Sequence, residues 1–228
     1  MMETMTQMRA TVVRNLLLAM AVGVLFVPAV VAQPTPSDVI TVATVTGSSG
    51  TIDVPVYIRD TAGTPLGIDQ PPGSRIQSYS INVLYGPAAA VQSITFTRGG
   101  ITQPLTPTFE NSPAVPGVSI ALLDTFDEGT NLIPFTSNAA LPGNQVATLH
   151  VTLAPSVAPG TTITLTLDPV LTQLTNEGGT TSETVANQRL TLVSGAIVVP
   201  SPIPALSTWA LVLLMVSLAV VAVRIQIS

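Results

Sequence analysis

Residues 145–167, QVATLHVTLAPSVAPGTTITLTL, carry the clearest structural pattern in this chain. In the second half, Ile163, Leu165 and Leu167 alternate with threonines. A period of two places alternate side chains on opposite faces of a β-strand. The Ala-Pro-Gly sequence between the halves is typical of a turn. The stretch therefore predicts a pair of strands with one face in a core and the other in water.

Similar short runs recur on both sides of this pair, with turn residues between them. We expect nine strands: VITVATVT (39–46), TIDVPVYIR (51–59), IQSYSINVLY (76–85), VQSITFT (91–97), VSIALLD (118–124), QVATLHVTL (145–153), TTITLTLD (161–168), VLTQLT (170–175) and RLTLVSGAIVV (189–199). No apolar pattern of period 3.6 persists between Asp38 and Val199, so helices should be few. The sequence predicts an all-β sandwich or barrel.

Two stretches should depart from regular strands. Pro55 lies inside TIDVPVYIR and cannot donate a ladder hydrogen bond, which predicts an edge strand or a bulge. Residues 98–117 are rich in Pro, Gly and Thr, and we expect either a surface connection or a functional loop.

The composition excludes several classes of function. The chain has 228 residues and no cysteine, so disulfides, thiol catalysis and thiolate metal sites are ruled out. Between residues 33 and 203 lie every acidic residue except Glu3 and only four of the seven arginines, which leaves a net charge of −7 there. Binding to nucleic acid requires a basic surface, so nucleic acid is not an expected partner.

The N-terminus has the organisation of a secretory signal peptide. Arg9 and Arg14 provide a positive start, residues 16–27 are apolar, and small residues end at Ala32. We expect cleavage between Ala32 and Gln33. The alternatives are an uncleaved signal anchor and a buried helix.

The C-terminus contains a second apolar segment, residues 209–223, which is shorter than the roughly 20 residues that cross a bilayer core. Together with Ile203, Pro204 and Leu206 before it, and with Trp209 and Arg224 at its ends, it resembles the IPTL-CTERM sorting signal of Gram-negative bacteria. In this chain Ala205 replaces the family's Thr, and one Arg makes up the basic tail. The resemblance implies recognition by a membrane processing enzyme. The alternative is a simple C-terminal anchor.

The middle of the chain resembles the cohesin domain, a nine-stranded jelly-roll sandwich related to some carbohydrate-binding modules. Three stretches carry the resemblance: GSSGTIDVPVYIRD (47–60), IQSYSINVLYGPAAAVQSITF (76–96) and the opening stretch, 145–167. The chain departs from the family where TPLGIDQPPGSR (64–75) lengthens a loop. It contains no calcium repeat of the dockerin kind, so a dockerin-like partner would be another protein.

The expected domain organisation follows from these segments. It comprises a signal peptide (1–32), a short linker (33–37), the cohesin-like sandwich (38–199), a Pro-rich stalk with the sorting motif (200–208), and a transmembrane helix with its tail (209–228).

Few residues suggest chemistry. His150 is the only histidine, and its strand position predicts a polar residue on the wet face. Asp124, Asp127 and Glu128 enter a turn, where oxygen ligands are able to hold calcium; the alternative is a solvated turn. No other cofactor is expected.

Carbohydrate-binding sandwiches use exposed aromatic rings. Tyr79 has the same strand parity as Ile81 and Val83 and should face the core. Three aromatic residues are expected in loops, free to contact a ligand: Phe109, Phe126 and Phe135.

These observations predict a non-catalytic, exported interaction module of the cell envelope or surface, in contact with a membrane at least transiently and released if its tail is processed. Its expected partner is a surface protein or a polysaccharide. The alternative is a structural surface or matrix protein with no defined ligand. An enzyme is not expected, because the sequence presents no pair of nucleophile and base.

Overall fold

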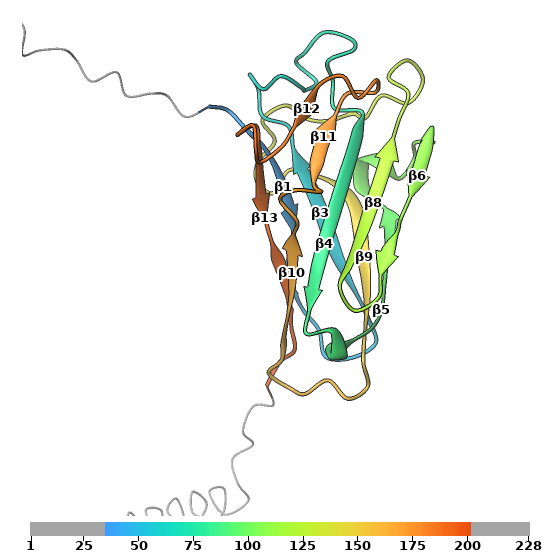
Figure 1. Cartoon of the computed structure of the whole chain (residues 1–228), viewed down its shortest axis with the longest axis vertical. Coiled ribbons are helices and arrows are strands. Elements are labelled where there is room, and N and C mark those ends of the chain that lie inside the picture. The colour runs from blue at the N-terminus through green and yellow to red at the C-terminus, as the bar shows by residue number, and fades with distance from the viewer. Residues whose placement is uncertain (1–34, 202–228) are drawn as a thin grey trace, which may run out of the picture. The chain divides into compact units, whose positions relative to one another are not determined.

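The computed structural model describes residues 35–201, which form a sandwich of two β-sheets (Figure 1). The predicted signal peptide, its cleavage site at Ala32 and Gln33, and the predicted C-terminal helix lie outside the described residues. Within residues 35–201, the helical elements are two short 3₁₀ turns, Ala88–Ala90 and Gly100–Thr102. No helix in this range has the length and apolar character needed to cross a membrane. The prediction of an all-β sandwich is confirmed.

The first sheet has five strands in the order β13-β1-β3-β9-β5. Neighbouring strands are antiparallel except for β1 and β13, which are parallel. The strands are β1 (Asp38–Val42), β3 (Thr51–Arg59), β5 (Val91–Arg98), β9 (Asn144–Leu153) and β13 (Leu190–Val193).

The second sheet is centred on β4 (Ser78–Gly86). Strand β8 (Ser119–Thr125) pairs with one edge of β4, and β10 (Thr162–Leu167) and β11 (Gln173–Thr175) pair with β4 as well. Five further short strands complete the sheet: β2 (Thr44–Thr46), β6 (Phe109–Asn111), β7 (Ala114–Val115), β12 (Ser182–Glu183) and β14 (Gly195–Val198).

One apolar cluster fills the space between the sheets. In β10, Ile163, Leu165 and Leu167 are buried and the threonines between them are exposed, as their alternation predicts. Tyr79 and Ile81 of β4 are buried by the same parity. Burying one side chain of this size contributes about 1.5–3 kcal/mol, and a shift of one residue would turn each of them into water.

Two predicted strands are each divided because the chain passes from one sheet to the other. Residues 39–46 form β1 in the first sheet and β2 in the second, and residues 189–199 form β13 and β14 in the same way. The two crossings lie against each other. A Cβ at Gly195 would stand 2.2 Å from the Ala43 carbonyl oxygen, so only glycine fits there.

Strand β3 is central in its sheet, so the edge position predicted from Pro55 is wrong. The carbonyl of Pro55 accepts a hydrogen bond from the Ala43 N–H at 3.0 Å. The N–H and C=O of a strand residue point to the same side, so the missing donor of Pro55 faces the place where β1 leaves the sheet. A register shift follows between Val56 and Tyr57, as the expected bulge would produce.

The described residues contain fourteen strands rather than nine. Every predicted run contains a strand, and two of the runs contain two. Strands β6, β7 and β12 were not predicted, because two or three residues are too few to show a period. Residues 98–117 are therefore only partly irregular, since β6 and β7 add to β8.

Candidate docking face

The outer face of β4, β8 and β10 carries no charged side chain at its outward strand positions. Alternation within each strand identifies these positions, which are Ser78, Ser80, Asn82, Leu84, Ser119, Ala121, Leu123, Thr125, Thr162, Thr164 and Thr166. Apart from the amide of Asn82 they are small, hydroxylated or apolar, and Asn82, Ser119 and Ala121 are buried while the other eight are at least partly exposed. A face of this composition loses little hydration free energy when a partner covers it, because no ion has to leave water.

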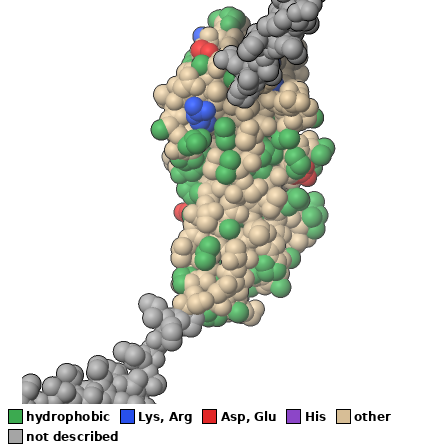
Figure 2. Space-filling model, turned by 90° about the vertical axis from the view of Figure 1, so that its left-hand side faces the viewer, with side chains coloured by type: hydrophobic (Ala, Val, Ile, Leu, Met, Phe, Trp, Pro, Cys, Tyr) green, Lys and Arg blue, Asp and Glu red, His purple; other side chains and the backbone are tan. Residues whose placement is uncertain are grey.

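Exposed apolar side chains lie along this face. Leu84 is opposite Ser119, and Ser119 is opposite Val115, so all three share one face. Phe109 is placed on the same face by its pairing with Thr125. Large apolar residues here are unusually accessible: Val115 is 55% exposed and Phe109 52%. On the side of the molecule shown in Figure 2, apolar and uncharged polar surface likewise predominates over charged side chains.

An apolar bulge projects beside this face between β10 and β11. Both strands pair with β4, and residues 168–172 loop out between them. Val170 is 83% exposed and Leu171 55%. The Ser80 hydroxyl donates to the Leu171 carbonyl at 2.8 Å, which places the bulge beside an outward residue of β4. Asp168 Oδ1 accepts the N–H groups of Val170 and Leu171, at 2.8 and 3.1 Å, so the projection is held in shape.

The first sheet presents a different outer face, on which His150 lies. The His150 Nδ1 atom is 2.6 Å from Asp53 Oδ1, and its Nε2 atom is 2.7 Å from the Thr97 hydroxyl. The wet-face position predicted for His150 is confirmed, whereas its two partners were not predicted. Acyl transfer by such a set also needs donors aimed at an oxyanion. At these positions β3, β9 and β5 pair with one another, so their backbone N–H groups belong to the sheet.

The three acidic residues predicted as calcium ligands are not brought together, which corrects that prediction. The Asp124 side chain is buried and accepts the Tyr79 hydroxyl at 2.7 Å. Asp127 accepts the Thr130 N–H, and Glu128 forms an ion pair with Arg75 at 3.4 Å. Within residues 35–201, no group of three or more histidine or acidic side chains is arranged to bind a metal.

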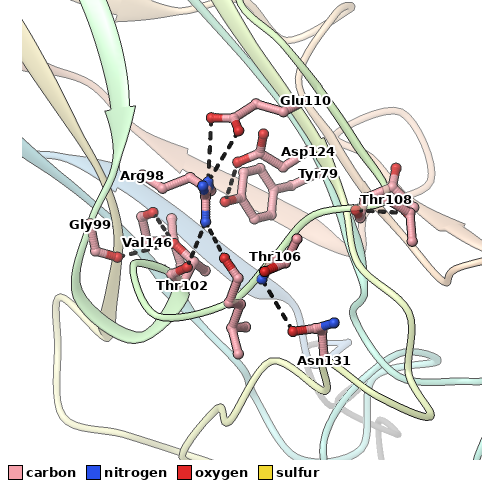
Figure 3. A network of polar contacts seen from close by, with 12 residues as sticks. Tyr79, Arg98, Gly99, Thr102, Thr106, Thr108, Glu110, Asp124, Asn131 and Val146 are labelled. Carbon is pink, nitrogen blue, oxygen red and sulfur yellow. Dashed lines mark hydrogen bonds and ion pairs between the residues drawn. The ribbon is translucent and has the colours of Figure 1, made fainter.

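Asp124 belongs instead to a network around Arg98 (Figure 3). Arg98 Nε lies 3.3 Å from Glu110, and its Nη1 donates to the carbonyls of Thr102 and Leu105. Burial raises the pKa of Asp124 to about 6; the Tyr79 hydrogen bond lowers it, Glu110 raises it and Arg98 lowers it. The network ties residues 98–110, which were predicted to be a loop, to strand β8.

Two of the three predicted ligand-contacting aromatic residues are in the core, so this prediction is wrong for them. Phe126 is fully buried and Phe135 is 6% exposed. Phe126 directly follows β8 and packs near Tyr79, with 6.2 Å between ring centroids. The loops fold over the end of the sandwich, and these rings complete its apolar filling. Phe109 alone of the three is exposed.

A buried pair of carboxyl groups was not visible in the sequence. Asp38 of β1 and Glu183 of β12 are both fully buried and hydrogen-bond to each other. Burial, followed by the hydrogen bond to Glu183 and its negative charge, raises the pKa of Asp38 to about 9. The pKa of Glu183 is also raised, mainly by burial. Asp38 Oδ2 and Glu183 Oε2 receive no other donor among the described residues, so a shared proton satisfies them.

The sandwich is cohesin-like. The third cohesin ScaC of Acetivibrio cellulolyticus, in complex with the ScaB dockerin, is similar with a TM-score of 0.51 and 14% identity, over 72% of this chain and 99% of that chain. CaCohA2 of Clostridium acetobutylicum, in its complex with CaDoc0917, is similar with a TM-score of 0.50 and 18% identity, over 72% and 99%. At these identities the likeness concerns the fold.

The predicted tail motif is confirmed. The IPTL-CTERM motif matches residues 201–226, which include Ile203, Pro204, Leu206, Trp209 and Arg224. No curated protein matches the chain significantly.

Proposed function

We propose that this chain is a non-catalytic interaction module that binds a protein partner through the outer face of β4, β8 and β10. The observation that carries the proposal is the uncharged face bordered by the exposed Val170–Leu171 bulge. Covering the exposed Val170 and Leu171 side chains with a partner would remove apolar surface from water, which contributes about 1.5–3 kcal/mol for each side chain that becomes fully buried. The two similar cohesins are each seen in a complex, one of them with a dockerin, which supports a partner of that kind.

The tail motif supports an envelope or surface location for this module. We propose that the signal peptide directs export and that a membrane processing enzyme acts on the C-terminal motif. The partner would then meet the sandwich outside the inner membrane.

Two observations weigh against the other functions considered. The described pocket of about 320 Å³, lined by Gln92 and by residues of the stretches 48–50 and 152–157, has no titratable side chain in its wall. Two of the three loop aromatic residues that were expected to contact a carbohydrate, Phe126 and Phe135, are buried in the core. We therefore propose a protein rather than a polysaccharide as partner.

The absence of cysteine permits a sharp test, because a single introduced thiol is unique. Thr164→Cys places it on the docking face, and Thr95→Cys places a matched thiol at an outward position of the first sheet. Each variant is coupled to a photo-crosslinker in the native host, and the cross-linked partner and the intact mass of the chain are identified from the surface fraction. We expect one protein partner from position 164 and none from position 95.

The identified partner is then titrated against the double variant V170D/L171D. We expect a loss of affinity of at least about tenfold. V193D is the control, since Val193 is an exposed residue of β13 on the opposite face. Equal cross-linking from both faces, or unchanged affinity of the double variant, would contradict the proposal. Retention of a glycan instead of a protein would assign the site to polysaccharide.

A further inference from the structure

The long connection from β3 to β4 leaves one buried carboxylate oxygen without a donor. Asp60 directly follows β3 and is fully buried. Its Oδ2 atom accepts the Ile68 N–H at 2.7 Å, but its Oδ1 atom has no hydrogen-bond partner. Leaving such an atom unpaired in the interior is costly, so the arrangement favours an additional positive group at this point.

A second carboxylate oxygen lies at the same point. A Cβ added to Gly67, which has a φ of +156°, would stand 2.6 Å from Asp69 Oδ1 and 2.7 Å from Asp60 Oδ1. Asp69 Oδ2 accepts the Gly63 N–H at 3.3 Å, which leaves Oδ1 toward Asp60. The space between the two oxygens exists because residue 67 has no side chain.

Basic side chains near Asp60 and Asp69 form hydrogen bonds or ion pairs with other groups. Arg59 precedes Asp60, but its Nε donates to the Ala139 carbonyl at 2.8 Å and its Nη1 to the Thr61 hydroxyl. Among the described residues, the ion pairs of the arginines involve other acids, Glu128 and Glu110. Within residues 35–201, no arginine forms an ion pair with Asp60 or Asp69, whose Oδ1 atoms both lie close to Gly67.

We propose that Asp60 and Asp69 bind one Ca²⁺ ion beside Gly67. Calcium takes hard oxygen ligands at about 2.3–2.6 Å, whereas Mg²⁺ needs about 2.0–2.1 Å and a stricter geometry. Both oxygens border the space beside Gly67, and the variable coordination number of Ca²⁺ allows two carboxylates to be completed by water. Asp69 is exposed, so water completes the coordination shell on its side, while Asp60 forms the floor.

A site with two carboxylates and several waters should be weak. Extracellular calcium modules have dissociation constants of about 10⁻⁴–10⁻³ M, and we expect this range here. The ion would join the end of β3 to the long connection, residues 64–75, that distinguishes this chain from the cohesin pattern. The inference concerns this end of the sandwich and does not depend on the docking face.

The test uses the full chain in detergent, freed of metal by a chelator. We expect the unfolding temperature to rise with the logarithm of Ca²⁺ concentration, and calorimetry to give one ion per chain. Asp69→Asn should weaken calcium binding by at least about tenfold, because it removes one of the two ligand charges. Asp127→Asn is the matched control. It neutralises a carboxylate in the cluster that the sequence suggested and keeps an oxygen for the Thr130 N–H.

The proposal is overturned if Ca²⁺ has no effect up to about 10 mM, well beyond the weakest expected range. An equal effect of Mg²⁺ would also overturn it, because the response would then be nonspecific. The same holds if Asp69→Asn and Asp127→Asn lose affinity alike.

Discussion

Two buried carboxyl groups of this sandwich, Asp124 and Asp38, have the same chemistry and different neighbours. Asp124 accepts the Tyr79 hydroxyl and lies near Arg98, and its pKa is about 6. Asp38 lies against the carboxyl of Glu183, and its pKa is about 9. Burial is the largest cause of the rise in both cases.

The difference shows that burial raises a carboxyl pKa, and that the neighbours then determine how far. A hydroxyl donor and a guanidinium stabilise the ionised form of Asp124. A second carboxyl stabilises the protonated form of Asp38, since one shared proton removes the repulsion between them. At the first site, Asp124, a positive charge and a hydroxyl donor stabilise the carboxylate. At the second site, Asp38, a proton shared with Glu183 stabilises the pair.

The largest effect is expected from removing the positive charge at the first site. Arg98→Met leaves Glu110 unpaired and the Leu105 carbonyl without a donor, whereas the Thr102 carbonyl keeps the Leu105 N–H as its donor. We expect a loss of about 2–3 kcal/mol in the free energy of unfolding, measured by urea denaturation. The control Arg189→Met should cost less than about 1 kcal/mol, since it breaks no strong pair. If Arg98→Met and Arg189→Met lowered the free energy of unfolding equally, Arg98 would contribute no more to stability than an arginine without a strong pair, and the first site would not depend on its positive charge.

The second site, Asp38 with Glu183, should make the free energy of unfolding depend on pH. Because the folded-state pKa of Asp38 is above its ordinary value of 3.8, the folded protein holds the proton more tightly, and its stabilising effect is lost as pH rises toward about 9. The free energy of unfolding should therefore fall by up to about 1.4 kcal/mol per pH unit over this range.

Asp38→Asn tests this assignment directly. The amide donates to Glu183 without needing a proton, so the pH dependence above about pH 7, where Asp124 is already ionised, should flatten. Urea denaturation at a series of pH values measures it. A slope that Asp38→Asn leaves unchanged would show that another group binds the proton.

The smallest effect is expected from Tyr79→Phe. It removes one donor from Asp124 and should cost about 1–2 kcal/mol. The pKa of Asp124 should rise above about 6, because the hydrogen bond that favours its ionised form is gone. Carboxyl titration by NMR measures the shift, with Tyr57→Phe on the outer face as control. An unchanged pKa would mean that Arg98 alone stabilises the carboxylate.

The strands were largely predictable because alternation is a local property. The runs at 51–59 and 145–153 match β3 and β9 within one residue, and the parity of Tyr79 was correct. The crossings of β1 to β2 and of β13 to β14 were not predictable, since each depends on contact between the two ends of the domain. Gly195 is the one sequence signal at the crossing of β13 to β14, and a single glycine in a strand is equally typical of a bulge, a bend or a close approach of another backbone.

The candidate sites were less predictable for the same reason. The bulge at Val170 and Leu171 lies in a run that was expected to be a continuous strand, and only pairing with β4 shows that it projects. Asp38 and Glu183 are far apart in sequence, so no spacing indicates that they meet. The loop aromatics were misplaced because sequence does not show which loops fold back over the core.

The parallel pairing of the first and last strands has a mechanical consequence. Asp38 begins β1 at one end of the sandwich, and Val198 ends β14 toward the other (Figure 1). Strand β1 pairs with β13 over four positions and β2 with β14 over three. Tension between the two ends of the domain would act along these ladders, so their hydrogen bonds would be sheared together rather than unzipped one at a time. Such a domain should resist a force applied between its two ends.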